Sequence, residues 1–352
     1  MRFVKGILFS LLLLIFSAPL AAQEEQEATG AEEEFDPGTF ILAHIADSHE
    51  WHILTKKNGE SVAIYLPVIV YQKDKGLDIF SSRRLAEGKE YKGYKVVEEE
   101  GDLKGKIVNV KPDGSIDEKN LPLDFSITKA VVGMLFAALI GLWLFVSLGS
   151  SYKKTGISNP KGIQSFLEPV VLFVRDDIAI PIIGEKKYEK YMPYLLTAFF
   201  FILLNNIIGL IPFPPPFGAN VTGNIAVTFV LALCTFLITQ FSGNKHYWKD
   251  IFAAPGVPVW LLPIMIPVEV IGMFSKPFAL MIRLFANITA GHIIVLSLVC
   301  LIFIFKSLAV APVSIFFVIF MDCLELLVAF LQAYVFTLLS TLFIGLAVKE
   351  EH

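Results

Sequence analysis

The chain has 352 residues, of which 55% are hydrophobic and only 18% are charged, and its formal net charge is -4. A mean hydropathy of +0.65 is typical of polytopic membrane proteins and excludes the class of ordinary soluble enzymes. The sequence has no basic domain that would predict nucleic-acid binding.

Residues 1–22 show the succession of basic, apolar and small residues that is typical of a secretory signal peptide. Two basic residues precede an apolar run from Ile7 to Phe16, and small residues follow before the acidic segment Gln23 to Asp36. An uncleaved membrane anchor is the alternative. In either case we expect residues 23–125, an acidic linker and a small domain, to be exported to the periplasm of a bacterium.

The exported region alternates short apolar and aromatic runs with turn residues from Phe40 to Val110, which predicts a β-rich domain. The expected strands are Ser61 to Tyr71, Leu77 to Phe80, Tyr94 to Val97 and Ile107 to Val110, and Pro112-Asp113-Gly114 predicts a hairpin near the end.

Three of the six histidines, His44, His49 and His52, stand close together in this region. Together they could hold a metal ion. However, His49 and His52 would point to opposite faces of a strand, and no second ligand cluster follows. A structural or subunit-contact role is favoured, and we expect neither a metal nor a cofactor.

Three membrane spans are expected next, at Ile127 to Gly149, Tyr194 to Ile211 and Asn224 to Phe241. Residues 152–190 are rich in Lys and Arg, whereas residues 212–223 contain neither. The positive-inside rule therefore places 152–190 in the cytoplasm, and Lys245 and Lys249 return the chain to that side.

The rest of the chain, Val257 to Val348, is almost continuously apolar and is broken only near Lys306 to Pro312. Each half is too long for one perpendicular crossing of about 20 residues, so two long, tilted helices in an antiparallel hairpin are expected. The predicted fold class is an all-α polytopic membrane protein with about five membrane helices, formed by residues 126–352, plus a small β-rich exported N-terminal domain.

Arg283 lies deep within this apolar sequence. A guanidinium keeps its charge at any physiological pH, so a position at membrane depth is expensive and indicates function. The alternative is that Arg283 snorkels to the headgroups. Apolar residues extend on both sides for more than half the membrane thickness, which disfavours that alternative.

Helix periodicity links Arg283 to four further polar residues. Asn287 shares its face, whereas His292 is rotated away, about 13.5 Å along the axis. On the second long helix Glu325 and Gln332 share a face about 10.5 Å apart. In an antiparallel hairpin Gln332 then lies level with Arg283, and Glu325 with His292. A carboxylate beside an imidazole suits a proton relay, whereas an arginine can only repel cations and attract carboxylates.

A solvated position at a helix end is the alternative for Glu325 and for Asp322, which lies one turn before it.

The same helices carry a set of longer motifs. They are Pro267-Val-Glu269, Phe274-Ser-Lys-Pro277, Arg283-Leu-Phe-Ala-Asn287-Ile-Thr-Ala-Gly291, Leu331-Gln332-Ala and Glu350-Glu351-His352, with Asn205-Asn206-Ile-Ile-Gly-Leu-Ile-Pro212 and Val221-Thr-Gly-Asn224-Ile in the earlier spans. In these motifs the chain resembles subunit a of the F-type ATP synthase, from about Ile127 to the C-terminus. The arginine motif is highly specific.

The resemblance implies that Arg283 faces a rotor ring of c subunits and that Gln332 is its neighbour on the last helix. Many relatives carry an acid at the position of His292 and a histidine at that of Glu325, so the chain resembles the family with these two groups exchanged. The long exported extension resembles the version found in the Bacteroidetes group. A bacterial inner membrane, a peripheral-stalk subunit b, the rest of the ATP synthase and membrane lipid are the implied surroundings.

The expected function is that of a stator proton channel with two half-channels that serve the rotor-ring carboxylates, with Asn287, His292 and Glu325 near the inlet. Protons are favoured over sodium because the His292 and Glu325 pair is a plausible proton relay. The chain has no Gly-rich phosphate-binding loop, so it is not expected to be an enzyme by itself. The alternatives are a self-contained ion transporter, which would predict internal repeats, and a membrane-anchored assembly protein that acts through its exported domain.

Overall fold

The computed structural model describes residues 36–55, 61–73, 75–97, 103–111, 114–117, 120–155, 162–211, 215–252, 258–305, 307 and 309–349. The expected signal peptide and most of the acidic linker lie outside the described residues. The chain divides into two compact units, a smaller one made mainly of residues 46–132 and a larger one made of residues 37–45, 133–212 and 217–352.

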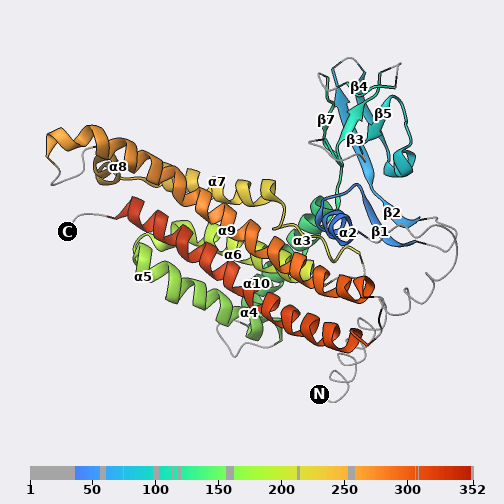
Figure 1. Ribbon diagram of the computed structural model, residues 1–352. Coiled ribbons are helices and arrows are strands. Elements are labelled where there is room, and N and C mark those ends of the chain that lie inside the picture. The colour runs from blue at the N-terminus through green and yellow to red at the C-terminus, as the bar shows by residue number, and fades with distance from the viewer. Residues whose placement is uncertain are drawn as a thin grey trace. The chain divides into compact units, whose positions relative to one another are not determined.

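The smaller unit is built from short antiparallel strands (Figure 1). Its described elements are β1 (Glu50–Thr55), β2 (Ser61–Tyr65), β3 (Pro67–Gln72), β4 (Gly76–Ser81), β5 (Tyr94–Val96), β6 (Ile107–Asn109) and β7 (Leu123–Asp124), with 3-10 turns η1 (Ser82–Arg84) and η2 (Ala86–Gly88). The strands form a β1–β2 pair, a sheet in the order β4–β3–β7 and a β5–β6 pair. The β-rich region is confirmed, although the expected strand from Ser61 to Tyr71 is in fact two strands.

Side-chain alternation gives this unit its core. Val68 and Val70 on β3 are fully buried and pack with Phe80 and Tyr94, whereas Tyr71 and its neighbours on the opposite face are exposed. Alternate residues of β3 therefore point to the same face, and the face that carries Val68 and Val70 is the buried one.

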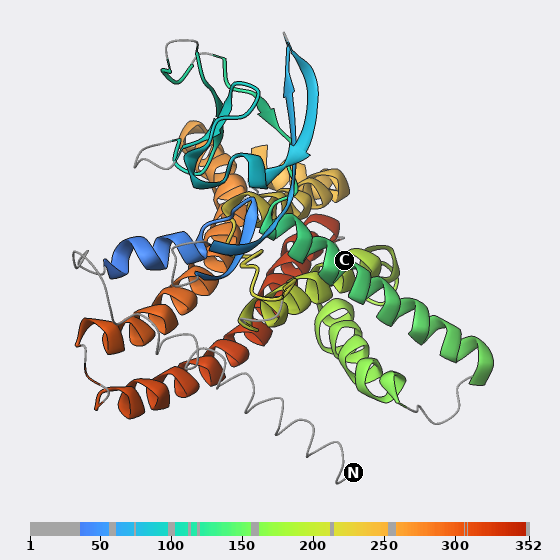
Figure 2. The same cartoon turned by 90° about the vertical axis from the view of Figure 1, so that its right-hand side faces the viewer.

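The expected β-rich domain runs from Phe40, but the first residues of that stretch are helical. Pro37–Ile45 form a helix, α2, which belongs to the larger unit and packs beside the long helix α9 (Figure 2). Proline at the first position of a helix suits that start because its fixed φ is helical and its missing N–H would have no partner there.

The larger unit is helical. Its described elements are α2, α3 (Lys129–Thr155), α4 (Ile163–Leu172), the π-helical segment η3 (Phe173–Ala179), α5 (Ile180–Ile183), α6 (Tyr188–Leu210), α7 (Ile225–Ser242), α8 (Lys245–Phe252), the 3-10 turn η4 (Val259–Leu261), α9 (Leu262–Ile304) and α10 (Ala311–Val348). Within the described residues five helices, α3, α6, α7, α9 and α10, are long and apolar enough to cross a membrane. The predicted fold class is confirmed.

The helices α9 and α10 form the expected long hairpin (Figures 1 and 2). They contain 43 and 38 residues. At 1.5 Å per residue they extend about 64 and 57 Å, roughly twice the thickness of the hydrocarbon core. Lengths of this kind require a strong tilt if both helices stay in lipid.

The core of the larger unit lies between α6 and α10. Leu195, Phe199 and Ile202 on α6 are fully buried, and they belong to one cluster with Phe336 of α10. A glycine allows the closest approach to the neighbouring α5 segment: a Cβ atom at Gly345 would stand 2.9 Å from the carbonyl oxygen of Ile182.

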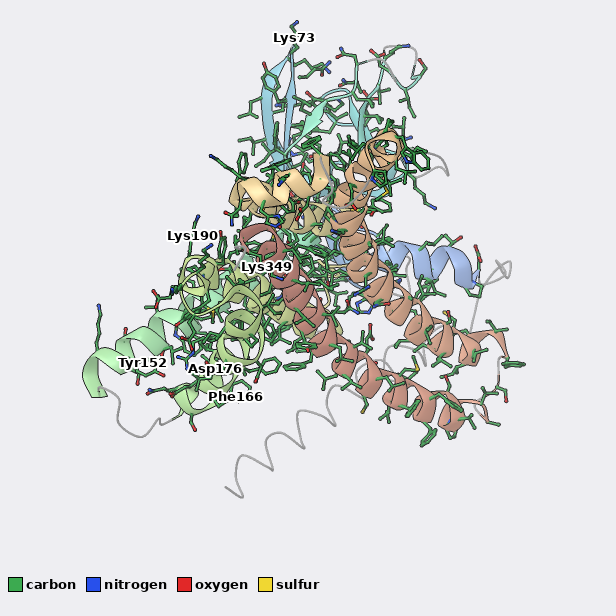
Figure 3. All side chains as sticks on the ribbon, turned by 90° about the vertical axis from the view of Figure 1, so that its left-hand side faces the viewer. Lys73, Tyr152, Phe166, Asp176, Lys190 and Lys349 are labelled. Atoms are coloured by element: carbon green, nitrogen blue, oxygen red, sulfur yellow. The ribbon has the colours of Figure 1, made fainter. Side chains whose placement is uncertain are left out.

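Three segments meet at the C-terminal end of α10. Lys187 Nζ donates a hydrogen bond to the carbonyl oxygen of Val348 at 2.9 Å, and Asn244 Nδ2 donates to the same oxygen at 2.9 Å. Lys190 and Lys349 are accordingly seen at the same end of the helices in Figure 3. The segments that the charge pattern assigns to one side of the membrane are therefore together in the fold.

Candidate functional site

The hairpin brings together an imidazole and a carboxylate that are 33 residues apart in the sequence. His292 Nδ1 on α9 lies 2.5 Å from Glu325 Oε1 on α10, a hydrogen-bonding distance. The two side chains are 17% and 6% exposed. This contact is the one that the antiparallel register predicts, and the burial of Glu325 is incompatible with a solvated helix end.

A glycine makes room for the carboxylate. An ideal Cβ at Gly291 would stand only 2.7 Å from Glu325 Oε1. The absence of a side chain at this position of α9 therefore allows Glu325 to reach the neighbouring His292. Asp322, one turn earlier on α10, is exposed instead.

Polar side chains from two other segments surround this pair. The pocket beside it is lined by Asn205, Asn206 and Gly209 of α6, by Asn220 and Thr222 of the connection before α7, and by His292 and Glu325. Buried amides at membrane depth are expensive unless they are hydrogen-bonded, so their concentration here marks the site.

Asn206 joins α6 to α10. Its Nδ2 donates to the carbonyl oxygen of Ala329 at 3.3 Å, and Thr222 Oγ1 donates to its Oδ1 at 2.5 Å. Ala329 lies one turn after Glu325 on α10, so this bond fixes the height of Glu325 relative to α6. The sequence offered one signal for Asn206, an amide pair inside an apolar span.

Arg283 and Asn287 point away from this pocket. Both are exposed, whereas Leu284 and Ile288 beside them are buried. Arg283 makes no hydrogen bond or ion pair with the residues that the structure describes. Gln332, by contrast, is buried on α10. The expected pairing of Arg283 with Gln332 at one level remains a prediction, as do the roles of all five residues.

The histidines near the N-terminus make separate contacts. His49 Nε2 lies 3.2 Å from Asp124 Oδ2, and His44 Nδ1 lies 2.9 Å from the carbonyl oxygen of Phe40. The side chain of His52 lies outside the described part of the chain. Among the described residues no group of three or more His, Cys, Asp or Glu is arranged to hold a metal.

The contact with His49 also affects Asp124. Burial alone raises the pKa of this carboxyl group, but hydrogen bonds from His49 and Ser126 outweigh it, so the pKa lies below its ordinary value. The His49–Asp124 pair therefore holds β7 and the start of β1 together most firmly when Asp124 is ionised.

The described residues contain five membrane-length helices, a buried imidazole–carboxylate pair and an exposed arginine on one hairpin. Together these features define an integral membrane protein with charged groups of the kind found along ion paths. The family model of the ATP synthase A chain matches residues 131–345, well over half of the sequence. The chain belongs to this family.

Sequence identities to individual relatives support the same family membership. The chain is 51% identical over 232 residues to ATP synthase subunit a of Chloroherpeton thalassium, covering 65% of this chain and 68% of the relative. It is 49% identical over 255 residues to ATP synthase subunit a 2 of Chlorobaculum tepidum, covering 70% of each, and 48% identical over 235 residues to ATP synthase subunit a of Myxococcus xanthus, covering 65% of this chain and 75% of the relative. The resemblance noted in the sequence is confirmed.

Residues 40–125 match a second family model, described as a domain of unknown function (DUF8433). The match begins within α2 and ends just after β7, so it takes in the described strands of the smaller unit.

Proposed function

We propose that the chain is the stator proton-channel subunit of an F-type ATP synthase, a non-catalytic subunit of the membrane sector. In this role it conducts protons through two half-channels to and from carboxylates of the rotor-ring subunit c, and so couples proton flow to ATP synthesis. The observation that carries the proposal is the buried hydrogen bond between His292 and Glu325 on the hairpin that also displays Arg283.

His292 and Glu325 are the proton-transfer groups of the inlet half-channel. Their 2.5 Å separation lets a proton move between the two without a change of rotamer. Each group compensates the charge of the other, so the pair can hold or release one proton inside an apolar region. Sodium prefers a cluster of oxygen ligands, whereas this pair supplies only one carboxylate. Protons are therefore favoured over sodium as the coupling ion.

Arg283 separates the two half-channels. Its exposure on α9 leaves its fixed charge available to a ring carboxylate outside this chain. The charge favours the deprotonated carboxylate and raises the barrier to a proton that would leak directly across. A leak of this kind would dissipate about 2.3 kcal/mol per charge per 100 mV. Asn287 on the same face is proposed to face the ring as well, and Gln332, which is buried on α10, is the proposed neighbour of Arg283 on the last helix.

The proposed topology follows the distribution of charge. Lys187, Asn244 and the end of α10 meet at one end of the larger unit, and the basic segment 152–190 assigns that end to the cytoplasm. Residues 1–22 are then a signal peptide, residues 23–125 a periplasmic region, and residues 126–352 the membrane domain in a bacterial inner membrane. Peripheral-stalk subunit b is the second proposed partner.

The test is ATP-driven proton pumping in inverted membrane vesicles that carry Arg283→Ala. Pumping should be abolished while the complex still assembles. Arg175→Ala is the matched control, because Arg175 is an arginine of η3 whose charge already pairs with Asp176 at 2.7 Å, and this variant should pump normally. Normal pumping by Arg283→Ala would refute the assignment.

Crosslinking supplies a second, independent test. A cysteine introduced at exposed Ile282 or Asn287 should crosslink to the mid-membrane helix of subunit c and stop pumping. Failure of several such pairs, in membranes where the chain is folded, would favour the self-contained transporter.

A further inference from the structure

The β4–β3–β7 sheet of the smaller unit has one apolar face that is exposed (Figure 1). Its other face packs against Tyr94 and Ile107 of the β5–β6 pair and forms the core. Side chains two residues apart share a face, and the register pairs Tyr71 with both Leu77 and Leu123. Six large side chains therefore lie together on the exposed face, which we call the outer face: Ile69, Tyr71, Leu77, Ile79, Leu123 and Phe125.

The outer face differs from the usual free face of an antiparallel sheet, which carries polar side chains. Leu77 and Ile79 on β4 are 60% and 62% exposed, and Leu123 and Phe125 are 58% and 63% exposed. Phe125 extends β7, because its N–H donates a hydrogen bond to the carbonyl oxygen of Ile69 at 2.8 Å. Isolated exposed apolar residues need no explanation, whereas a contiguous apolar face of this kind marks an interaction site.

Hydrogen bonds tie this sheet to the beginning of α3, the first described helix of membrane length. The N–H of Ile127, two residues before α3, donates to the carbonyl oxygen of Pro67 at the start of β3, at 3.1 Å. In the first turn of α3 the N–H of Ala130 donates to Asp47 Oδ1 at 3.0 Å. Tyr71 is four residues from Pro67, only about 13 Å along the strand. The outer face is therefore held beside the end of a membrane span.

The segments that precede and connect the strands are too polar to cover the outer face. Residues 56–60 and 98–102 consist of Lys, Asn, Gly, Glu and Asp, and residues 23–36 are acidic. A second copy of the chain fits poorly, since a stable dimer buries about 800 Å² and about 20 to 30 residues on each side. Lipid needs no such minimum area, because α3 already holds the sheet at the membrane and raises its effective concentration there.

A basic side chain stands at the end of the sheet that is bonded to the span. The register pairs Ser81 of β4 with Pro67, and exposed Arg83 follows two residues later. A guanidinium beside the end of a span suits the phosphates of lipid headgroups, with which it forms charge-assisted hydrogen bonds. Apolar side chains next to a basic residue are the combination that interfacial membrane segments use.

We propose that the outer face is a lipid-binding surface that rests on the membrane leaflet at which α3 begins. Its apolar side chains enter the boundary between phospholipid headgroups and acyl chains, and Arg83 bonds a lipid phosphate. This contact supports α3, because only 11% of the apolar window of that helix is buried in the protein. The inference goes beyond the proton-channel function and is independent of the path that protons take.

The test measures whether the outer face contacts lipid in the whole ATP synthase. Spin labels are attached to Ile79→Cys and Leu123→Cys, with the three native cysteines replaced by alanine, and the complex is reconstituted into vesicles of phosphatidylethanolamine and phosphatidylglycerol. Lys106→Cys is the control, because exposed Lys106 directly precedes β6, on the core side of the sheet. Collisions of each label with oxygen, which dissolves in lipid, and with a water-soluble nickel complex are then compared.

The ratio of oxygen to nickel collisions should be several-fold higher at positions 79 and 123 than at position 106. Equal ratios at the three positions would overturn the proposal, because the outer face would then be in water. Labels at positions 79 and 123 that neither reagent reaches would also overturn it, since a protein partner would then cover the face.

A charged variant supplies a second measurement. Leu77→Glu should lower the collision ratio at position 123 toward that at position 106, because a carboxylate resists entry into lipid. Leu77 is mostly exposed, so the smaller unit should still fold. Lys106→Glu adds a carboxylate on the core side of the sheet and should leave the ratio at position 123 unchanged. A ratio that Leu77→Glu also leaves unchanged would refute the lipid contact. Neither measurement uses proton pumping, so this failure is distinct from a failure of the proposed function.

Discussion

Gly291→Ala tests the geometry of the buried pair directly. The new Cβ would stand 2.7 Å from Glu325 Oε1, and an ordinary contact needs about 3.4 Å, so the carboxylate must retreat by about 0.7 Å. Oε1 is the oxygen that meets His292 Nδ1 at 2.5 Å, so a retreat directly away from the ring lengthens the separation to at most about 3.2 Å, the outer limit of a good hydrogen bond. Complete loss of a hydrogen bond to a charged group costs about 1.5 to 3 kcal/mol, which sets the upper bound for this weakened bond. The proton-transfer rate through the pair should therefore fall, by no more than roughly 10- to 150-fold.

The fold itself should tolerate this change. The atoms that must move belong to the end of a flexible side chain, and alanine favours a helix over glycine by about 1 kcal/mol. The assay is passive proton conductance of the membrane sector, with Gly272→Ala as the control. Gly272 lies on the same helix, and a Cβ there meets nothing within 4 Å. If Gly291→Ala assembles and conducts as well as Gly272→Ala, the hydrogen bond between the pair does not limit proton transfer and the reasoning is refuted.

Two further predictions concern stability. Gly345→Ala should lower the stability of the larger unit by about 1 to 3 kcal/mol, because its Cβ meets a backbone oxygen of Ile182 at 2.9 Å; thermal unfolding compared with Gly149→Ala, where a Cβ meets nothing within 4 Å, checks this. The second concerns Asp124, whose pKa is lowered by the fold, so its contribution is present above its ordinary pKa of about 3.9 and is lost as pH falls through the lower folded value. Protection factors of the amides in β3 and β7 should thus fall a few-fold more between pH 6 and pH 3 than in Asp124→Asn, and an equal fall in both proteins would exclude the contact with His49 as the cause.

The membrane part of the fold could be predicted largely from the sequence. Lipid forces each spanning segment to satisfy its own backbone hydrogen bonds, so long apolar runs have few alternatives to a helix. The same regularity predicted the contact of His292 with Glu325, because a helical hairpin fixes which levels meet once the turn is located.

The remaining parts of the fold and of the candidate site depend on residues that no periodic sequence pattern indicates. Pro37–Ile45 is a short apolar segment that reads equally well as a strand or a helix, and its packing beside α9 decides for the helix. Asn220 reaches the pocket from a connection between helices, where no repeat indicates the direction of a side chain. Gly291 matters because it has no side chain where Glu325 lies, and this close approach is visible only once the neighbouring helix is placed.

The bonds at the end of α10 have a mechanical consequence for a stator. In the proposed function a turning ring exerts a sideways load on the surface that carries Arg283, and a helix of about 57 Å held only at its turn would bend under that load. Lys187 and Asn244 both donate hydrogen bonds to the final carbonyl oxygen of α10. These bonds connect the end of α10 to the segment before α6 and to the connection after α7, which would share the load. The hairpin is thereby braced at the end farthest from its own turn.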